Sequence, residues 1–410
     1  MAYRTLKSVF YQRDAAGADS EERARRTSPA AISWDFELSK NQLFCMTTPY
    51  LSVVTERIMS LNARAEAIWA TIPPIAQSHY FSTMIVEEIQ ATNEIEQVNS
   101  SRREITDALR SLKHDSARDR RFREMVRLYA ALGDRTAAAP TTLDDIRAVY
   151  DNVTRGEVDP KDSPDGDRFR AGIVEITSGQ RVLHRGLVPE QAIASGLTVM
   201  LAQRRDDGVP HLIRAAVSHL IFEVVHPFYD GNGRTGRFLL ALDLAEQLSP
   251  VSWFSLSATI FENRDRYYRA FTDLEHPLNR ADATPFIEVM LEIIAESLHR
   301  VTVDLSTRRE SLERLHLGVR DIDLSNYAIT ADDDLRDILF ALGQAALFDI
   351  DDAFTLNDLT AAGSRSKRYI RDKAQTLVDA GLVDIVSRKP LRFRLSTAGR
   401  AVCAIDDLSS

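Results

Sequence analysis

Apolar residues recur three and four positions apart along most of the chain between about residue 50 and residue 315. The segment LSVVTERIMSLNARAEAIWA has this spacing, and Tyr80 to Val98 repeats it after the break at IPP. Residues at this spacing fall on one face of an α-helix, so the pattern predicts a helical body. Ser101 and Glu104 form a capping-box pair that predicts a further helix start. We expect additional helices over 119–132, 143–152, 189–206, 210–225, 234–247, 263–274 and 284–315.

One β element is expected inside this helical body. Residues 168–185 read RFRAGIVEITSGQRVLHR, in which branched residues alternate before the turn signal SGQ. Alternation followed by a turn predicts a β-hairpin. The predicted fold class is therefore mainly α, with a small hairpin.

The pattern changes toward both ends of the chain. Residues 1–35 are polar and rich in small and charged residues, which predicts a flexible N-terminal arm. Residues 36–318 then form one helical domain, and the break VRDIDLSNYAIT at 319–330 predicts a linker. Over 331–405, two short helices, a longer helix ending at Gly381 and two strands around SRKP predict a winged helix-turn-helix.

Charge is distributed unevenly along the 410 residues. The whole chain has a formal net charge of −9, which argues against nucleic-acid binding by its entire surface. Residues 363–400 instead contain ten Lys and Arg residues against three acidic residues. This basic segment indicates DNA contact through phosphate attraction, and the alternative is a solvated helix face on a protein-docking module.

The cysteines and the absence of long apolar runs indicate the compartment. Cys45 and Cys403 are the only two cysteines and lie far apart, which predicts neither a metal cluster nor a disulfide framework. The N-terminus has no continuous apolar segment typical of a signal peptide, and no run of about 18 apolar residues occurs in the sequence. We expect a cytoplasmic protein that does not contact membranes.

The segment HPFYDGNGRTGR at 226–237 follows the apolar run HLIRAAVSHLIFEVV. Pro227 should end the first helix, and RTGRFLLALDLAEQL restarts a helical period. The segment is therefore a loop that leads into a helix N-terminus, where free backbone N–H groups and the helix dipole favour an anion. Gly231 and Gly233 allow the backbone to approach a phosphate closely.

The side chains of this segment suit a nucleotide triphosphate. Arg234 and Arg237 lie three residues apart and can both reach phosphates. Asp230 supplies an oxygen ligand that suits Mg²⁺, and His226 can act as a general base near neutral pH. Each residue alone also has an ordinary explanation, such as a cap or a turn, but their combined spacing favours a phosphate site beside a base.

The full string resembles the signature of the Fic family, histidine-x-phenylalanine-x-acid-GNGR-x-x-arginine, at every specified position. The resemblance implies an adenylyltransferase that uses ATP and Mg²⁺ to attach AMP to a hydroxyl side chain of a target protein, with self-modification as one outcome. The intact GNGR argues against the kinase-like branch of the family. The implied roles are His226 as base, Asp230 for the metal, Asn232 polarising the α-phosphate, and Gly231, Asn232, Gly233, Arg234 and Arg237 for the phosphates.

Many members of this family also carry an inhibitory helix with Ser or Thr, three residues, then Glu and Gly or Asn. Thr92 and Glu96 match this pattern, whereas Gln97 departs from it at the last position. Ser100 and Glu104 have the same spacing and are better explained as a helix cap. The resemblance implies that Glu96 pairs with Arg237 and removes a phosphate contact, so that the enzyme is autoinhibited and could also remove AMP.

The resemblance extends to the target and to the nucleoside. It implies that the hairpin at 168–185 is a flap that pairs with an extended target segment. It also implies that Tyr267 or Tyr268, within ENRDRYYRAF, contacts adenosine, although aromatic residues in helices more often belong to a core. The contrasting hypothesis is a DNA-binding regulator with an inactive or nucleotide-sensing Fic domain. In either case a homo-oligomer could regulate the chain.

Overall fold

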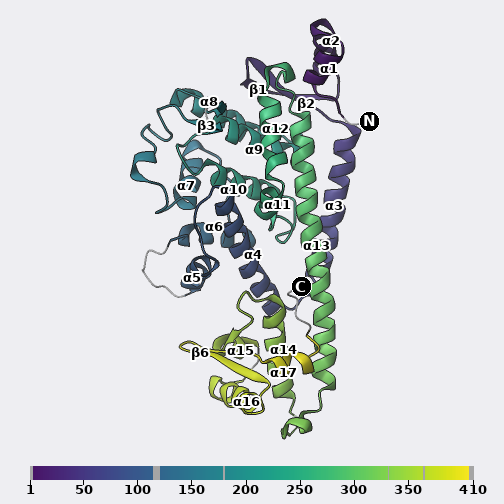
Figure 1. Ribbon diagram of the computed structural model, residues 1–410, viewed down its shortest axis with the longest axis vertical. Helices are drawn as coiled ribbons and strands as arrows, with labels where there is room; N and C mark the ends of the chain where they lie inside the picture. The colour runs from purple at the N-terminus through teal and green to yellow at the C-terminus, as the bar shows by residue number, and fades with distance from the viewer. Residues whose placement is uncertain (1–2, 114–120, 179–180, 331, 363–364, 406–410) are drawn as a thin grey trace. The chain divides into compact units, whose positions relative to one another are not determined.

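The structure is a computed structural model that describes residues 3–113, 121–178, 181–330, 332–362 and 365–405 (Figure 1). These residues contain many α-helices and three small antiparallel sheets, so the predicted mainly α class is confirmed. The chain divides into two compact units. Unit 1 combines Met1–Ala63 with Ile85–Arg300, and unit 2 combines Arg64–Met84 with Val301–Ser410. The boundary expected at residue 318 does not coincide with this division.

Three helices contribute residues to both units, namely α3 (Pro49–Trp69), α4 (Pro74–Ile95) and α13 (Thr284–Asp321). The other elements of unit 1 are α1 (Leu6–Gln12), α2 (Ala15–Arg26), β1 (Ala31–Leu38), β2 (Asn41–Met46), α5 (Arg102–Lys113), α6 (Arg123–Gly133), α7 (Leu143–Val153), η1 (Pro160–Asp162), β3 (Glu175–Ser178), β4 (Arg181–Arg185), α8 (Glu190–Gln203), α9 (His211–Val225), α10 (Asn232–Ala245), α11 (Leu256–Glu262), α12 (Arg264–Glu275) and η2 (Pro277–Asn279). Part of the helix expected over 119–132 lies outside the described residues.

The polar composition of residues 1–35 predicts a flexible arm, but the described part of this segment is folded. The hydroxyl of Thr5 accepts the Ser8 amide and caps α1, which buries Leu6 and Val9. Asp14 caps α2 through the Gly17 amide. The polar composition of this segment did not predict its folded structure, because many of its charged side chains have specific partners far along the chain.

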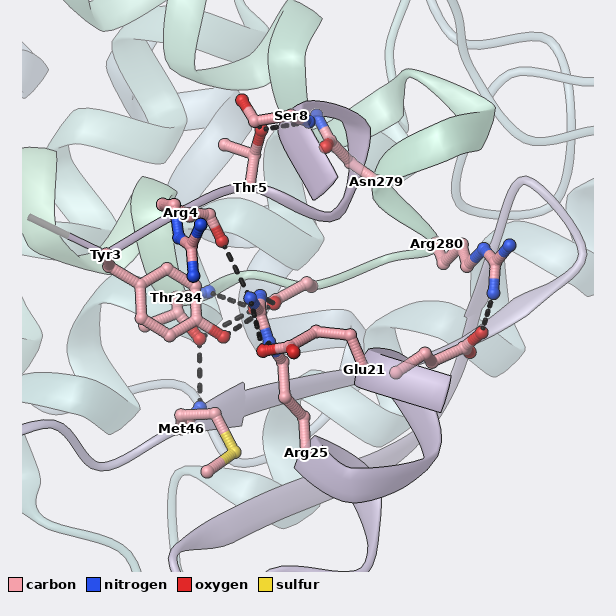
Figure 2. A network of polar contacts seen from close by, with 12 residues as sticks. Tyr3, Arg4, Thr5, Ser8, Glu21, Arg25, Met46, Asn279, Arg280 and Thr284 are labelled. Atoms are coloured by element: carbon pink, nitrogen blue, oxygen red, sulfur yellow. Dashed lines mark hydrogen bonds and ion pairs between the residues drawn. The ribbon is translucent and has the colours of Figure 1, made fainter. Parts of the chain in front are cut away.

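Several of these partners meet at Asp282. Figure 2 shows Tyr3, Arg25 and Thr284, which bond to this carboxylate. Arg25 Nη1 and the Tyr3 hydroxyl both donate to Asp282 Oδ2, at 2.9 Å and 2.7 Å. The amide and the hydroxyl of Thr284 donate to Asp282 Oδ1 at 3.0 Å and 2.6 Å. A buried carboxylate is stable only when its charge and its lone pairs are satisfied, as they are here. This network fastens the N-terminal segment to the start of α13.

A second hairpin, which the sequence analysis did not predict, follows the N-terminal helices. Strands β1 and β2 pair antiparallel with Ile32 opposite Cys45. Trp34, Phe36 and Leu38 are buried at alternate positions of β1, which is the period-2 pattern of a half-buried strand. The expected hairpin at 168–185 is present in a shorter form, as β3 and β4.

Helices α9 and α10 form the core of unit 1 around the loop 226–231, which contains the start of the HPFYDGNGRTGR segment. Nearly every residue of α9 is buried, including Val217, Leu220 and Ile221, which explains its almost continuously apolar sequence. α10 is buried along most of its length too, although its first turn is polar. The loop between them is therefore held by two fixed helix ends.

The sequence of unit 2 continues beyond α13 with η3 (Leu324–Tyr327), α14 (Asp333–Phe348), β5 (Phe354–Thr355), α15 (Leu356–Ala362), α16 (Lys367–Asp379), β6 (Val383–Arg388), β7 (Leu391–Leu395) and α17 (Thr397–Val402). The sheet order is β5-β7-β6, and the hairpin β6–β7 follows α16. Its core includes Leu342, Leu377 and Phe393. The assignment of these elements to the winged helix-turn-helix class stays a prediction.

Among the residues that the structure describes, no helix combines the length and apolar character needed to cross a bilayer.

Candidate functional site

The loop 226–231 connects the C-terminus of α9 to the N-terminus of α10 and is held by hydrogen bonds of Asn232 and by ring stacking of Phe228. Asn232 Oδ1 accepts the Phe228 amide at 2.9 Å, and Asn232 Nδ2 donates to the Phe228 carbonyl at 2.7 Å. The Phe228 ring is buried and stacks on Tyr150 with ring centroids 3.6 Å apart. Phe228 therefore anchors the loop, as predicted. Both polar atoms of the Asn232 side chain therefore help to close the loop. The contact of Asn232 with a phosphate stays a prediction.

The N-terminus of α10 has the features of an anion site. Gly231 occupies the N-cap position with φ of 82°, and no side chain caps this end. The first N–H groups of a helix have no partner within the helix, so they remain available to a negative group. A Cβ placed on Gly233 would lie 2.0 Å from Glu96 Oε1. The carboxylate of Glu96 is thus packed against the Gly233 α-carbon, at the entrance to this helix end.

Arg237 joins α10 to the end of α4. Its Nη2 donates to Glu96 Oε1 at 2.7 Å and to the Thr92 carbonyl at 3.1 Å, and its Nε donates to the Thr92 hydroxyl at 2.7 Å. The side chain is almost completely buried. Burial lowers the pKa of Arg237, but the charges of Glu96 and its neighbours raise the pKa above its ordinary value overall, so the guanidinium stays charged.

His226 ends α9 in the left-handed conformation, with φ of 50° and ψ of 63°. Its Nδ1 lies 3.3 Å from the Glu223 carbonyl oxygen. A carbonyl only accepts, so Nδ1 carries the proton and Nε2 offers a lone pair. Burial lowers the pKa of His226 to about 3, with a further contribution from the His184 ring, whose centroid is 5.8 Å away. The imidazole is therefore neutral at pH 7 with an unprotonated Nε2, and the lowered pKa makes it a weaker base than a free imidazole.

Arg234 has a different partner from Arg237. Its side chain is fully buried, and Nη1 donates to Glu157 Oε2 at 3.2 Å. Arg121 Nε donates to the other oxygen of Glu157 at 2.9 Å. Arg234 Nη2 lies 3.8 Å from Asp230 Oδ2 and makes no hydrogen bond with the described residues. The two arginines therefore have different acidic partners, and the binding of the outer phosphates by both stays a prediction.

Asp230 lies at the solvent side of the loop. Its side chain is 45% exposed, and its Oδ1 accepts the Gly231 amide at 2.6 Å. Within the described residues, no group of three or more metal-binding side chains occurs. This arrangement fits Mg²⁺ bound with a nucleotide, because that ion usually takes one or two carboxylates together with phosphate oxygens and water.

The two tyrosines proposed for adenosine have different environments. Tyr267 is 2% exposed, and its hydroxyl donates to His219 Nε2 at 2.7 Å, because His219 Nδ1 faces the Gly236 carbonyl at 3.2 Å. Tyr267 is thus part of the core, and its contact with adenosine stays a prediction. Tyr268 is 47% exposed. Burial of the rest of this side chain, together with the charge of Glu96, raises the pKa of Tyr268 to about 12. Tyr268 therefore remains the candidate for a contact with a nucleoside.

Two residues near the loop were not predicted from the sequence. Glu223 lies close to Arg237 and Gly236, and burial raises its pKa to about 8. Arg170 donates to the carbonyl oxygen of His226 at 2.8 Å. Neither residue has a local sequence signal, because each depends on where the chain returns to the loop.

Comparisons with known proteins support the assignment of this region. Residues 140–244 match the model of the Fic/DOC family. The chain is 35% identical over 78 residues to "Probable protein adenylyltransferase aq_aa38" of Aquifex aeolicus, covering 19% of this chain and 22% of that protein. It is 32% identical over 99 residues to "Protein adenylyltransferase fic-1" of Caenorhabditis elegans, covering 24% of this chain and 18% of that protein. The chain thus matches about a fifth of the length of these relatives.

The fold is similar to a crystal structure of a Fic family protein from Desulfovibrio desulfuricans G20. The TM-score is 0.52 at 22% identity, over 86% of this chain and 97% of that chain. The chain therefore contains a Fic family domain, and the relatives that match it in sequence are named protein adenylyltransferases.

Proposed function

We propose that this chain transfers AMP from ATP to a hydroxyl side chain of a target protein. The observation that carries the proposal is the position of the Glu96 carboxylate, which is packed on Gly233 and paired with Arg237. A negative group at a helix N-terminus beside a buried arginine marks an anion site, and a phosphate has the same charge requirements. His226, whose Nε2 is free to accept a proton, lies at the other end of the same loop.

The transfer needs one proton acceptor and stabilisation of the phosphates. The target oxygen bonds to the α-phosphorus, its proton passes to His226 Nε2, and the bond to the bridging oxygen breaks to release pyrophosphate. The first N–H groups of α10 and the Arg237 guanidinium stabilise the phosphate charge. Asp230 would hold Mg²⁺, which neutralises phosphate charge when it is bound.

Glu96 inhibits this reaction in the proposed scheme. Its carboxylate occupies the Arg237 contact that the outer phosphate requires, and the Thr92 hydroxyl and carbonyl fix Arg237 in that orientation. Removal of Glu96 leaves the other two contacts of Arg237 in place. The expected consequence is a site that binds MgATP more tightly and in a productive orientation.

The flap formed by β3 and β4 supports a protein as the second substrate. Ile173 and Ile176 are 62% and 42% exposed, and Val182 is 43% exposed on the opposite strand. Exposed branched residues beside unpaired strand edges suit the addition of an extended segment through backbone hydrogen bonds. We therefore expect the modified hydroxyl to lie on an extended part of the target.

Incubation with α-labelled ATP and Mg²⁺ tests the proposal. The Glu96→Gly variant should label itself or proteins of a lysate, and Glu96→Gly/His226→Ala should not. Glu94→Gly is the matched control, because Glu94 is an exposed glutamate in the last turn of α4, two residues before Glu96. Label that persists without His226, or no label in Glu96→Gly, would exclude this function.

A second activity, DNA binding by unit 2, is favoured by a separate observation. Lys367 and Arg368 begin α16, and Arg388 and Lys389 lie at the turn between β6 and β7. All four side chains are exposed, and none has an acidic partner in the part of the chain that the structure describes. Unpaired cations on a helix and on an adjoining hairpin suit the phosphates of a DNA duplex.

Titration of the full-length protein with a labelled duplex at several salt concentrations tests this activity. We expect the affinity to fall steeply between about 50 and 200 mM salt. Arg368→Glu/Lys389→Glu should weaken binding and reduce the salt dependence by about one counterion per charge removed. The control is Arg57→Glu, an exposed arginine of unit 1. Equal loss in both variants would argue against this surface.

A further inference from the structure

Arg170 is a buried arginine that no role proposed above uses. Its side chain is completely buried and donates four hydrogen bonds, all to backbone carbonyls. Nε donates to His226 at 2.8 Å, Nη1 to Gly172 at 2.6 Å, and Nη2 to Leu187 at 2.9 Å and to Val225 at 3.3 Å. One guanidinium therefore contacts three separate segments of the chain.

These three segments are the parts of the site that meet during the proposed reaction. Gly172 precedes the first flap strand, β3, and Leu187 follows the second, β4. Val225 and His226 form the C-terminus of α9, where the proposed base lies. The Leu187 amide also donates to the Val225 carbonyl at 3.1 Å, so a backbone hydrogen bond joins the end of the flap to α9 as well.

The charge of Arg170 is balanced by dipoles alone. No acidic side chain pairs with it among the described residues, and burial lowers its pKa. Burying a guanidinium costs free energy unless its donors are satisfied, and here the carbonyls at the C-terminus of α9 supply both acceptors and the negative end of the helix dipole. An apolar side chain could fill this volume, but it could not fix the four carbonyls in one geometry.

The guanidinium is closely packed against Gly186. A Cβ on Gly186 would lie 2.2 Å from Arg170 Nη2 and 3.0 Å from the His226 Cβ. His226 itself has φ of 50°, a conformation that an L-residue holds only when its neighbours impose it. The hydrogen bond from Arg170 to the His226 carbonyl is one such constraint.

We propose that Arg170 is a positioning residue that fixes the target-binding flap relative to His226. A target strand aligned on β3–β4 then presents its hydroxyl to His226 Nε2 at a distance that the guanidinium sets. This inference rests on the proposed function, and it adds a residue that acts through the base and the flap without touching ATP. Loss of this geometry should slow transfer and leave nucleotide binding intact.

The test uses Glu96→Gly protein as the parent and adds Arg170→Lys, which keeps a cation but cannot reach four carbonyls at once. Gly186→Ala is the second variant, because its methyl group displaces the guanidinium without changing Arg170. Arg25→Lys is the matched control, since Arg25 is a buried arginine in the network around Asp282 (Figure 2). Each variant is measured for amide hydrogen exchange, for the affinity for MgATP and for the labelling rate at saturating MgATP.

We expect both test variants to exchange faster in the flap, over 172–178 and 181–187, and at the C-terminus of α9, over 224–226, together, whereas the rest of the loop stays held by Asn232. The labelling rate should fall roughly 100-fold, as a misplacement of about 1 Å can produce, while the affinity for MgATP stays within about twofold. The Arg25→Lys variant should lose thermal stability and keep its labelling rate. An unchanged rate in both test variants, a parallel loss of MgATP affinity, or faster exchange in the flap alone would overturn the proposal.

Failure of the proposed function would be recognised separately. In that case the Glu96→Gly parent shows no labelling that depends on His226, before any change at Arg170. The exchange measurement still decides the inference, because coupled loosening of the flap and the C-terminus of α9 does not require turnover. Independent exchange of the two segments would then contradict it.

Discussion

Arg237 Nη2 lies 2.7 Å from Glu96 Oε1, in a contact that joins the second turn of α10 to the residue directly after the C-terminus of α4. The same guanidinium is held by the hydroxyl and the carbonyl of Thr92. Charge-assisted hydrogen bonds of this kind each contribute about 1.5–3 kcal/mol. A phosphate must therefore replace a specific and well-oriented carboxylate before it can use Arg237.

The first prediction concerns the affinity for MgATP. Glu96→Gly should bind MgATP about 10- to 100-fold more tightly than the parent, because the phosphate no longer competes with a contact of this strength. Isothermal titration calorimetry measures the difference directly. The control Glu94→Gly should bind as the parent does. Equal affinities for the parent and Glu96→Gly would show that Glu96 does not restrict the site.

The second prediction concerns Gln97, which departs from the Gly or Asn of the family pattern. Gln97 has φ of 57°, its amide donates to the Glu94 carbonyl, and the Val98 amide donates to the Asn93 carbonyl. These bonds form a Schellman motif, in which the left-handed position favours Gly or Asn. Gln97→Gly should raise Tm by about 1–3 °C and weaken MgATP binding, because it stabilises the helix end that carries Glu96. A lower Tm with unchanged affinity would contradict this explanation.

The third prediction separates two roles for Asn232. The side chain bonds to the amide and the carbonyl of Phe228, so Asn232→Ala leaves both buried groups unsatisfied. We expect a loss of about 2 kcal/mol in the free energy of unfolding, together with loss of MgATP binding as the loop relaxes. Chemical denaturation and calorimetry measure the two effects. Loss of transfer at unchanged stability would instead indicate direct action of Asn232 on the α-phosphate.

The fourth prediction concerns pH and Glu223. Burial raises the pKa of Glu223 to about 8 from the ordinary value of 4.5, so between these values the folded protein keeps a proton that the unfolded chain releases. The free energy of unfolding therefore falls as pH rises from 4.5 to about 8, and the full decrease is present above about pH 8. Glu223→Gln should be more stable than the parent near pH 8.5, with a smaller difference near pH 5. Thermal unfolding at both values is the measurement, and a difference independent of pH would exclude this titration.

The sequence was informative where the determinants of structure are local. The ends of α9 and α10 lie within two residues of the predicted positions, because Pro227 and the glycines after it control the backbone directly. The contact between Glu96 and Arg237 was also expected, since the spacing from Thr92 resembles a family pattern.

Tertiary contacts decided the features that the sequence did not reveal. Arg234 faces Glu157 and Tyr267 faces His219, and both pairings depend on segments that meet only in the folded chain. The N-terminal helices depend on Asp282, which lies more than 250 residues away. The hairpin β1–β2 differs, because its alternation at Trp34 and Phe36 was visible and could have predicted a strand.

The central claim is transfer of the nucleotide part of ATP with departure of the outer phosphates. The most direct measurement incubates the Glu96→Gly variant with ATP labelled at the α-phosphate, and in parallel with ATP labelled at the γ-phosphate, and counts protein-bound label. The account predicts protein-bound label from the α-position alone, and none when His226 is also replaced by alanine. Label from the γ-position, or equal labelling without His226, would contradict it.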